Sequence, residues 1–413
     1  FLLLPLFCAA LAAQSFAQDT AAAAADVLPP PTGAHGVGRV SFHWADASRA
    51  EALSKEPGAR RELMVHLYYP TRPGAAGGPA RYFPEAERVR DYEERRFGKG
   101  FMREEFGDSY EAVFGARTHT VEGAPLPAGR ARYPVLVFMP GLGVKVFLYT
   151  ALVEELASRG YVVAAVETPY DTDTVVFPGG RVVEQSDDWN LYVGRDPDAA
   201  ARFHLARIDV NAADAGFVLD QLERLDSGRL KGAAVSFKGR LDVRRAGVLG
   251  HSQGGLAARR ACQTDARWRA CANLDGGLRD KEIETMGREP VRAPLMLMTG
   301  HFTSPKILSE QRAQFRGLRA EGYKVSVKAP GFGHFIYYDL ELPEAKQEAS
   351  RNGLPTAQRR RDTQIIRAYA LAFFDKYLRA LPQPLLDAPQ TSYPEVTVEK
   401  FPADAPRPSA IRE

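Results

Sequence analysis

The 413-residue chain is poor in cysteine and has no excess charge of either sign. It contains 3 cysteines, 54 basic and 51 acidic residues, so its formal net charge is only +3. A surplus this small, spread along the chain, forms no basic stripe and argues against nucleic acid as a partner. Hydrophobic residues make up 45% and charged residues 25% of the chain, which is typical of a globular protein with one large domain or two ordinary ones.

The sequence also lacks a hydrophobic run long enough to span a membrane. Residues 1–13 are almost wholly apolar, but they fall short of the ~20 residues that a transmembrane helix needs. Ser15 and Ala17 place small residues at the two positions that a signal peptidase checks. We therefore expect residues 1–17 to be a secretory signal peptide with a truncated n-region, and the protein to be secreted or periplasmic.

Only Cys262 and Cys271 remain after such a signal. In an oxidising compartment these two cysteines could pair. The alternative is that they are two buried free thiols, because cysteine is among the most buried residue types. Neither cysteine has a second ligand at the spacing of a zinc finger, so no metal site is expected.

Strand and helix patterns alternate along most of the chain. Residues 18–38 are rich in Ala, Pro and Gly and are expected to form a flexible leader. Short apolar or alternating runs predict strands over 39–45, 62–69, 135–139, 161–166, 246–249, 270–274, 295–298 and 323–327. Helices are predicted over 146–158, 196–225 and 360–380, the second opened by Asp196 as N-cap and Pro197 in the first turn. This order indicates an α/β domain over 39–381, with a mostly parallel sheet covered by helices on both faces, and a Pro-rich tail over 382–413 that wraps its surface.

An insertion at about 83–116 carries aromatic residues at roughly helical spacing among charged ones. These are Phe97, Phe101, Phe106, Tyr110 and Phe114. One interpretation is an amphipathic lid or interfacial helix that makes transient contact with lipid. The other, which we favour, is a helical insertion that packs its apolar stripe onto the domain. Three interspersed glycines count against one continuous helix.

The motif that carries the chemistry is Gly250-His-Ser-Gln-Gly254, between the predicted strand 246–249 and a helix-like stretch. In this setting, G-x-S-x-G is the nucleophile elbow of the α/β-hydrolase fold. The glycines two before and two after the serine let strand and helix approach each other without Cβ clashes. We therefore predict an α/β-hydrolase fold with Ser252 as its nucleophile.

A serine hydroxyl needs a histidine to accept its proton, and in this fold the acid and the histidine follow the serine in that order. Only His301 and His334 lie downstream of Ser252. His334 follows the last predicted strand, on a glycine-rich loop, and is the predicted general base. His301 is expected to be a pocket or structural residue.

The acid is predicted from what one strand end lacks. The segment after strand 295–298 contains no Asp or Glu, whereas strand 270–274 leads directly into Asp275 and two glycines. Asp275 is therefore the predicted acid that orients the histidine. The alternative is that this Asp-Gly pair only forms a turn, with Asp265 and Asp280 as weaker substitutes for the acid.

Acyl transfer also needs hydrogen-bond donors for the developing oxyanion, which contribute about 3–4 kcal/mol each. We predict the backbone N–H groups of Gln253 and of Leu142, the latter in the glycine-rich loop after strand 135–139. Aromatic residues suggest an apolar acyl pocket, although any of them could be core: Phe147, Tyr149, Phe302, Phe332, Phe335 and Tyr337. Of these, Phe147, Phe302 and Phe335 are the predicted substrate contacts. The chemistry implies no metal or organic cofactor.

Several segments together resemble the platelet-activating factor acetylhydrolases of the plasma, lipoprotein-associated phospholipase type. They are Tyr133–Gly143, Leu156–Glu167, Gly250–Gly255 and Leu274–Gly277, the last standing where that family keeps its catalytic Asp. The likeness covers about 60–380 in order and spacing. It implies a calcium-independent esterase that releases short or oxidised sn-2 acyl groups from phospholipids. It also implies Ser252, Asp275 and His334 as the triad and Leu142 and Gln253 as the oxyanion donors.

The chain departs from that family at positions that line the predicted pocket. Pro140 stands where the family usually has His, Gln253 where it often has Phe, and Gly276-Gly277 where a bulkier pair is common. These differences bear on the substrate rather than on the chemistry. The alternatives are a polyesterase, cutinase- or dienelactone-hydrolase-like esterase, and a catalytically inactive hydrolase fold that binds lipid. A cutinase-like enzyme would carry its acid after strand 295–298, and a complete candidate triad argues against inactivity.

Overall fold

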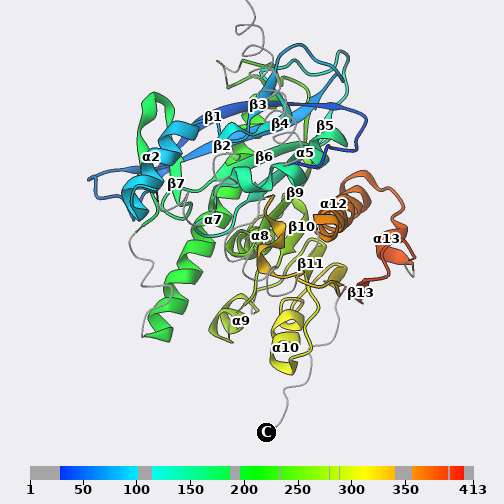
Figure 1. Ribbon diagram of the computed structural model, residues 1–413. Helices are drawn as coiled ribbons and strands as arrows, with labels where there is room; N and C mark the ends of the chain where they lie inside the picture. Colours follow the sequence, from blue (N-terminus) through cyan, green and yellow to red (C-terminus); the bar gives the residue numbers. More distant parts are fainter. Residues whose placement is uncertain are drawn as a thin grey trace, which may run out of the picture.

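An 11-stranded sheet forms the centre of the molecule, with the order β13-β12-β11-β10-β9-β5-β6-β2-β1-β4-β3 (Figure 1). The computed structural model describes residues 28–100, 114–186, 196–230, 232, 234–278, 280–287, 289–339, 356–388 and 391–403. The strands are β1 Gly36–Ala50, β2 Arg60–Thr71, β3 Pro79–Arg81, β4 Arg117–Glu122, β5 Tyr133–Met139, β6 Val162–Glu167, β9 Leu241–His251, β10 Trp268–Leu274, β11 Leu295–Gly300, β12 Gly322–Val327 and β13 Val396–Phe401. Two short strands, β7 Thr174–Val176 and β8 Val182–Glu184, pair separately.

The six central strands, β6, β5, β9, β10, β11 and β12, run parallel. Strand β2 is antiparallel to both β6 and β1, and β13 is antiparallel to β12. All eight strands predicted from the sequence are present. The parallel order places the carboxyl ends of the six central strands at one edge, where α/β proteins bind their ligands.

Helices cover both faces of this sheet (Figure 1). On one face lie α5 Thr150–Ser158, which follows the 3-10 turn η1 Val146–Tyr149, and α12 Thr356–Arg379; on the other lie α7 Pro197–Asp226 and α8 Gln253–Thr264. Side chains of β5 alternate between the two cores: Phe138 packs with the α12 face, and Val137 with the α7 face. Asp196 caps α7, because its carboxylate accepts the N–H groups of the second and third helical residues.

Both ends of the chain take a larger part in the domain than we predicted. Leu28 is buried, the Thr32 N–H donates to Glu155, and Arg367 of α12 donates to the carbonyls of Pro29 and Pro30. The prediction of a flexible leader is therefore wrong for residues 28–38. The prediction that the tail wraps the surface is wrong at β13, which pairs with β12 and extends the sheet. The short alternating pattern of β13 was missed because prolines flank it.

The insertion packs onto the domain in the part that the structure describes. Helix α2, Ala86–Phe97, buries Ala86, Val89 and Tyr92, while the Phe114 ring lies 5.7 Å from that of Phe83. Phe97 is exposed at the end of the helix. Phe101, Phe106 and Tyr110 lie outside the described residues. The remaining short helices are α9 Asp280–Met286, α10 Pro305–Ala313 and α13 Pro384–Asp387, with the 3-10 turns η2 Pro178–Gly180 and η3 His334–Tyr337.

Cys262 near the end of α8 and Cys271 in β10 form a disulfide, with their Cα atoms 6.5 Å apart. Among the described residues, every helix is too short or too polar to cross a lipid bilayer.

Candidate active site

Ser252 stands on a sharp turn between β9 and α8, at the carboxyl edge of the sheet. Its backbone has φ 55° and ψ −123°, a conformation that costs a side-chain-bearing residue energy and marks a built turn. The glycines are required by close approach: a Cβ at Gly250 would lie 2.3 Å from the Gly254 carbonyl oxygen. One at Gly254 would lie 2.2 Å from the Met139 oxygen. The sequence therefore folds into the strand–turn–helix that the motif predicted.

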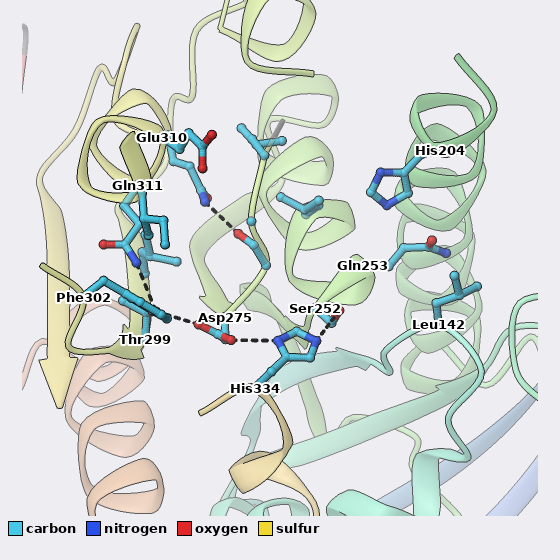
Figure 2. Close-up of a pocket in the computed structure, with 17 residues that line it drawn as sticks. Leu142, His204, Ser252, Gln253, Asp275, Thr299, Phe302, Glu310, Gln311 and His334 are labelled. Carbon is cyan, nitrogen blue, oxygen red and sulfur yellow. Dashed lines mark hydrogen bonds and ion pairs between the residues drawn. The ribbon is translucent and has the colours of Figure 1, made fainter. Parts of the chain in front are cut away.

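The structure brings the three residues of the predicted triad into one hydrogen-bonded chain (Figure 2). His334 Nε2 lies 2.9 Å from Ser252 Oγ, and His334 Nδ1 lies 2.7 Å from Asp275 Oδ2. A carboxylate only accepts hydrogen bonds, so Nδ1 carries the proton and Nε2 accepts the serine O–H. This is the tautomer that a general base needs.

Asp275 occupies the position that the sequence indicated, directly after β10, and its carboxylate has a second partner. Thr299, at the end of β11, donates its hydroxyl to Asp275 Oδ1 over 2.6 Å. Strand β11, whose end carries no acid, thus contributes Thr299, which holds the carboxylate of Asp275 at the end of the neighbouring strand β10. His301 is exposed and is absent from the described residues that line the cavity beside Ser252.

A buried amide network supports the turn that presents Asp275. Asn273 Oδ1 accepts the Gly276 N–H, and Asn273 Nδ2 donates to the Gly276 carbonyl and to Gln314 Oε1. Gln314 Nε2 donates to the same carbonyl. The sequence analysis missed both residues. A polar residue inside the apolar run of β10 is the signal that could have drawn attention to Asn273.

A second network joins the three loops of the site, and it was also missed. Tyr149 Oη accepts the Gly141 N–H over 3.1 Å and lies 2.9 Å from His251 Nδ1, while His251 Nε2 lies 2.9 Å from the His334 carbonyl oxygen. The carbonyl can only accept, so Nε2 carries the proton and the tyrosine O–H donates to Nδ1. Burial, and then the charge of His334, hold the pKa of His251 well below its usual value. His251 is therefore a neutral link between the elbow and the histidine loop.

The predicted oxyanion donors line the same cavity as Ser252. The N–H groups on either side of Leu142 are engaged, Gly141 with Tyr149 Oη and Gly143 with the Asp171 carbonyl. Within the described part of the chain, the Leu142 N–H has no protein partner. Gln253 is the first residue of α8, and the first N–H groups of a helix have no partner within it.

The cavity has a volume of about 420 Å³ and opens beside Ser252 (Figure 2). Its walls are mainly apolar, from Leu142, Leu256, Leu278, Leu297, Phe302 and Ile307. Besides the predicted triad, the lining carries the polar side chains of Glu310 and Gln311 of α10 on one side and of His204 of α7 on the other (Figure 2). The pocket can therefore hold a small, largely apolar group with a polar end.

The aromatic residues predicted to contact substrate separate into different places. Phe302 lines the cavity. Phe147 does not, and this is a correction: its ring lies 4.6 Å from His66 and borders another cavity. With three residues per turn in η1, Phe147 and Tyr149 cannot face the same way, and Tyr149 faces the site. Phe335 is a second correction, because its half-buried ring lies 5.5 Å from His334 outside the cavity lining. Tyr149, Phe332 and Tyr337 belong to the buried core.

Fold and site together define an ester hydrolase with the α/β-hydrolase architecture, and comparison with known proteins places it more narrowly. Residues 21–313 match the family model of platelet-activating factor acetylhydrolase, isoform II. The chain belongs to this family. The match ends before His334, so the support for this histidine comes from the sequence argument above and from its hydrogen bonds in the structure.

Individual relatives agree with this assignment. The chain is 25% identical over 408 residues to a probable 1-alkyl-2-acetylglycerophosphocholine esterase of Arthroderma benhamiae, covering 90% of this chain and 93% of that one. It is 24% identical to the platelet-activating factor acetylhydrolase of Cavia porcellus, over 76% of this chain and 72% of the relative. Among solved structures, the ferulic acid esterase of Streptomyces cinnamoneus is 32% identical with a TM-score of 0.68, over 90% of this chain and 98% of that one.

Proposed function

We propose that the chain is an exported ester hydrolase that acts on short or oxidised sn-2 acyl esters of phospholipids, or on similar small acyl esters. The observation that carries this proposal is the continuous hydrogen-bonded chain from Asp275 through His334 to Ser252 beside an apolar cavity. The acetyl-ester activity in the name of the Arthroderma benhamiae relative supports a short acyl group.

Acylation begins with Ser252 Oγ attacking the ester carbonyl carbon. His334 Nε2 takes the hydroxyl proton, and Asp275 stabilises the imidazolium that forms. The oxyanion accepts hydrogen bonds from the N–H groups of Leu142 and Gln253. His334 then gives its proton to the leaving alcohol as the ester C–O bond breaks. A water molecule, deprotonated by His334, releases the acyl group by the same steps in reverse.

Export is the proposal for the cellular location. The apolar stretch at residues 1–13 with small residues before position 18 supports it. The Cys262–Cys271 disulfide supports it independently, because disulfides persist in oxidising compartments. Reducing and non-reducing mass spectrometry of the protein recovered from the medium or periplasm tests both points together.

A second candidate function is hydrolysis of esters of hydroxylated aromatic acids. The ferulic acid esterase of Streptomyces cinnamoneus shares more sequence identity with this chain than the acetylhydrolase relatives described above. The cavity also favours it in one respect, since the flat ring of Phe302 stands in a wall that carries Glu310 and Gln311. These polar groups could accept hydrogen bonds from a phenolic hydroxyl, which an alkyl chain lacks.

One substrate profile separates the two candidates. We would measure kcat/KM on p-nitrophenyl esters of increasing acyl length, on a 1-alkyl-2-acetyl glycerophosphocholine, and on methyl ferulate. Efficient release of sn-2 acetate supports the first candidate, and efficient cleavage of methyl ferulate with inert phospholipid replaces it by the second. Ser252→Ala is the control, and turnover that persists in this variant would refute the mechanism for either substrate.

A further inference from the structure

A second cavity lies on the sheet away from the Ser252 site. Its volume is about 550 Å³, and residues of β1, β2, β6, α2 and η2 border it. The two cavities share no lining residue among those described. Nothing in the acyl-transfer mechanism above uses the polar side chains that this second cavity contains.

Three of its side chains form a serine–histidine–carboxylate chain. Ser41 of β1 and His66 of β2 are directly opposed partners in the antiparallel ladder, and Ser41 Oγ lies 2.8 Å from His66 Nδ1. His66 Nε2 lies 3.3 Å from Oε2 of Glu167, the last residue of β6. All three side chains line the cavity. The sheet register therefore builds the arrangement from three neighbouring strands.

The proton positions follow from the acceptor at one end. The Glu167 carboxylate only accepts hydrogen bonds, so His66 Nε2 carries the proton. His66 Nδ1 is then an acceptor, and it faces the Ser41 O–H. This is the order found at Asp275, His334 and Ser252, with the two ring nitrogens exchanged. The His66 and Glu167 side chains are 5% and 6% exposed, whereas Ser41 is exposed.

The surroundings of His66 hold its ring in place and contain paired charges. The Phe147 ring lies 4.6 Å from the His66 ring and restricts its rotation. Lys145, which is 4% exposed and pairs with Asp173 and Glu93, borders the same cavity, as does Arg88. Arg88 in turn pairs with Glu85, so both cations are balanced by carboxylates and add no net positive charge beside Ser41. Ser41 lies on an extended strand without the helix N-terminus that follows Ser252, so its hydroxyl is expected to react more slowly than that of Ser252.

We propose that Ser41 is a second nucleophile, which accepts acyl groups from small activated carboxylic esters in this cavity. Ser41 Oγ attacks the carbonyl carbon while its proton passes to His66 Nδ1. The bond to the leaving alkoxide or phenolate then breaks, and the leaving group departs with the electron pair. The proton on His66 passes to the leaving group or to solvent, and the acyl group stays on Ser41 as an ester. This inference goes beyond the proposed function and does not depend on Ser252.

Acetylation of the full-length Ser252→Ala variant tests the proposal. The variant is incubated with p-nitrophenyl acetate, nitrophenolate release is followed, and the modified peptide is located by mass spectrometry. The expected result is one acetyl group on the peptide that contains Ser41, and none there in Ser252→Ala/Ser41→Ala. Adding His66→Gln to Ser252→Ala is expected to slow the reaction by about 100-fold, as for loss of a general base.

Matched controls separate this from chance acylation. Ser48 is an exposed serine on the same strand whose hydroxyl bonds to Asp46 rather than to a histidine, and it is expected to stay unmodified. His66→Gln with Ser252 intact is expected to keep its esterase activity, which shows that the fold survives. No acetyl group on Ser41, equal labelling of Ser48, or an undiminished rate in the His66→Gln variant would overturn the proposal. None of these outcomes bears on the hydrolytic role of Ser252.

Discussion

Removing one buried hydroxyl, in Tyr149→Phe, tests whether the network between the three loops positions the reacting groups. In the structure this hydroxyl accepts the Gly141 N–H and donates to His251 Nδ1, and both rings are fully buried. Phenylalanine keeps the ring but leaves a buried donor and a buried acceptor without partners, each costing about 1–3 kcal/mol. Part of this cost is offset, because phenylalanine has no hydroxyl that must leave water on folding. We therefore expect the free energy of unfolding to fall by about 2–4 kcal/mol.

The effect on catalysis follows from what the network holds. Gly141 precedes the Leu142 donor, and His251 bonds to the carbonyl of His334, so the variant releases both loops around Ser252. A displacement of about 1 Å at a reacting group can cost on the order of 100-fold in rate. We therefore expect kcat to fall by about 10- to 100-fold while KM for a small ester changes little.

The assay pairs urea unfolding with steady-state hydrolysis of p-nitrophenyl acetate, and Tyr161→Phe is the matched control. Tyr161 is also fully buried and donates its hydroxyl to Asp375, but it lies just before β6, at the edge of the sheet opposite the site. It is expected to lose about 1–2 kcal/mol of stability with kcat unchanged. A Tyr149→Phe enzyme that is destabilised yet turns over at the wild-type rate would refute the positioning argument.

Four other changes have expected outcomes that follow from the geometry. Asp275→Asn should lower kcat on p-nitrophenyl acetate by about 10⁴-fold without a large change in KM, because an amide favours the wrong histidine tautomer; a loss under tenfold would exclude it as the acid. Gly254→Ala should prevent folding, since its Cβ would lie 2.2 Å from a carbonyl oxygen of β5, and a soluble variant with normal circular dichroism would contradict this. Replacing Cys262 and Cys271 by alanine opens a loop of sequence separation 9 and should cost about 2.5 kcal/mol in urea unfolding, while reductant should then have no further effect. Burial raises the pKa of Asp339 to about 8, so the native protein holds a proton there that the unfolded chain has lost above about pH 4. The free energy of unfolding should therefore fall as pH rises from about 4 to 8. Asp339→Asn should flatten this slope in urea titrations at several pH values.

The sequence predicts the central fold and the triad residues because their signals are local. Each central strand is a short apolar run buried on both faces, and the elbow needs glycines at fixed positions around Ser252. Asp275 required one further argument, the absence of an acid after β11. The catalytic roles of these residues remain predictions until the variants above are measured.

The rest could not be predicted because it depends on contacts between distant segments. Strand β13 pairs with β12, which lies about 70 residues earlier in the chain, and residues 28–35 contact α5 and α12. The direction of a side chain in a short 3-10 turn decides that Tyr149, not Phe147, reaches the site. His251 occupies a variable position of the motif, so its role appears only once the partners of its two ring nitrogens are known.

The pairing of β13 with β12 has a consequence for the order in which the chain is made. Synthesis runs from the N-terminus, so β12 emerges long before β13, which covers its edge. Helix α12, which donates to the carbonyls of Pro29 and Pro30, emerges after β12 and before β13. The nascent protein therefore cannot pair the open edge of β12 until β13 has left the ribosome. Translation that stops shortly before β13 would leave an open strand edge, which is a template for aggregation. The emergence of β13 is thus the step of synthesis that covers this edge of the sheet.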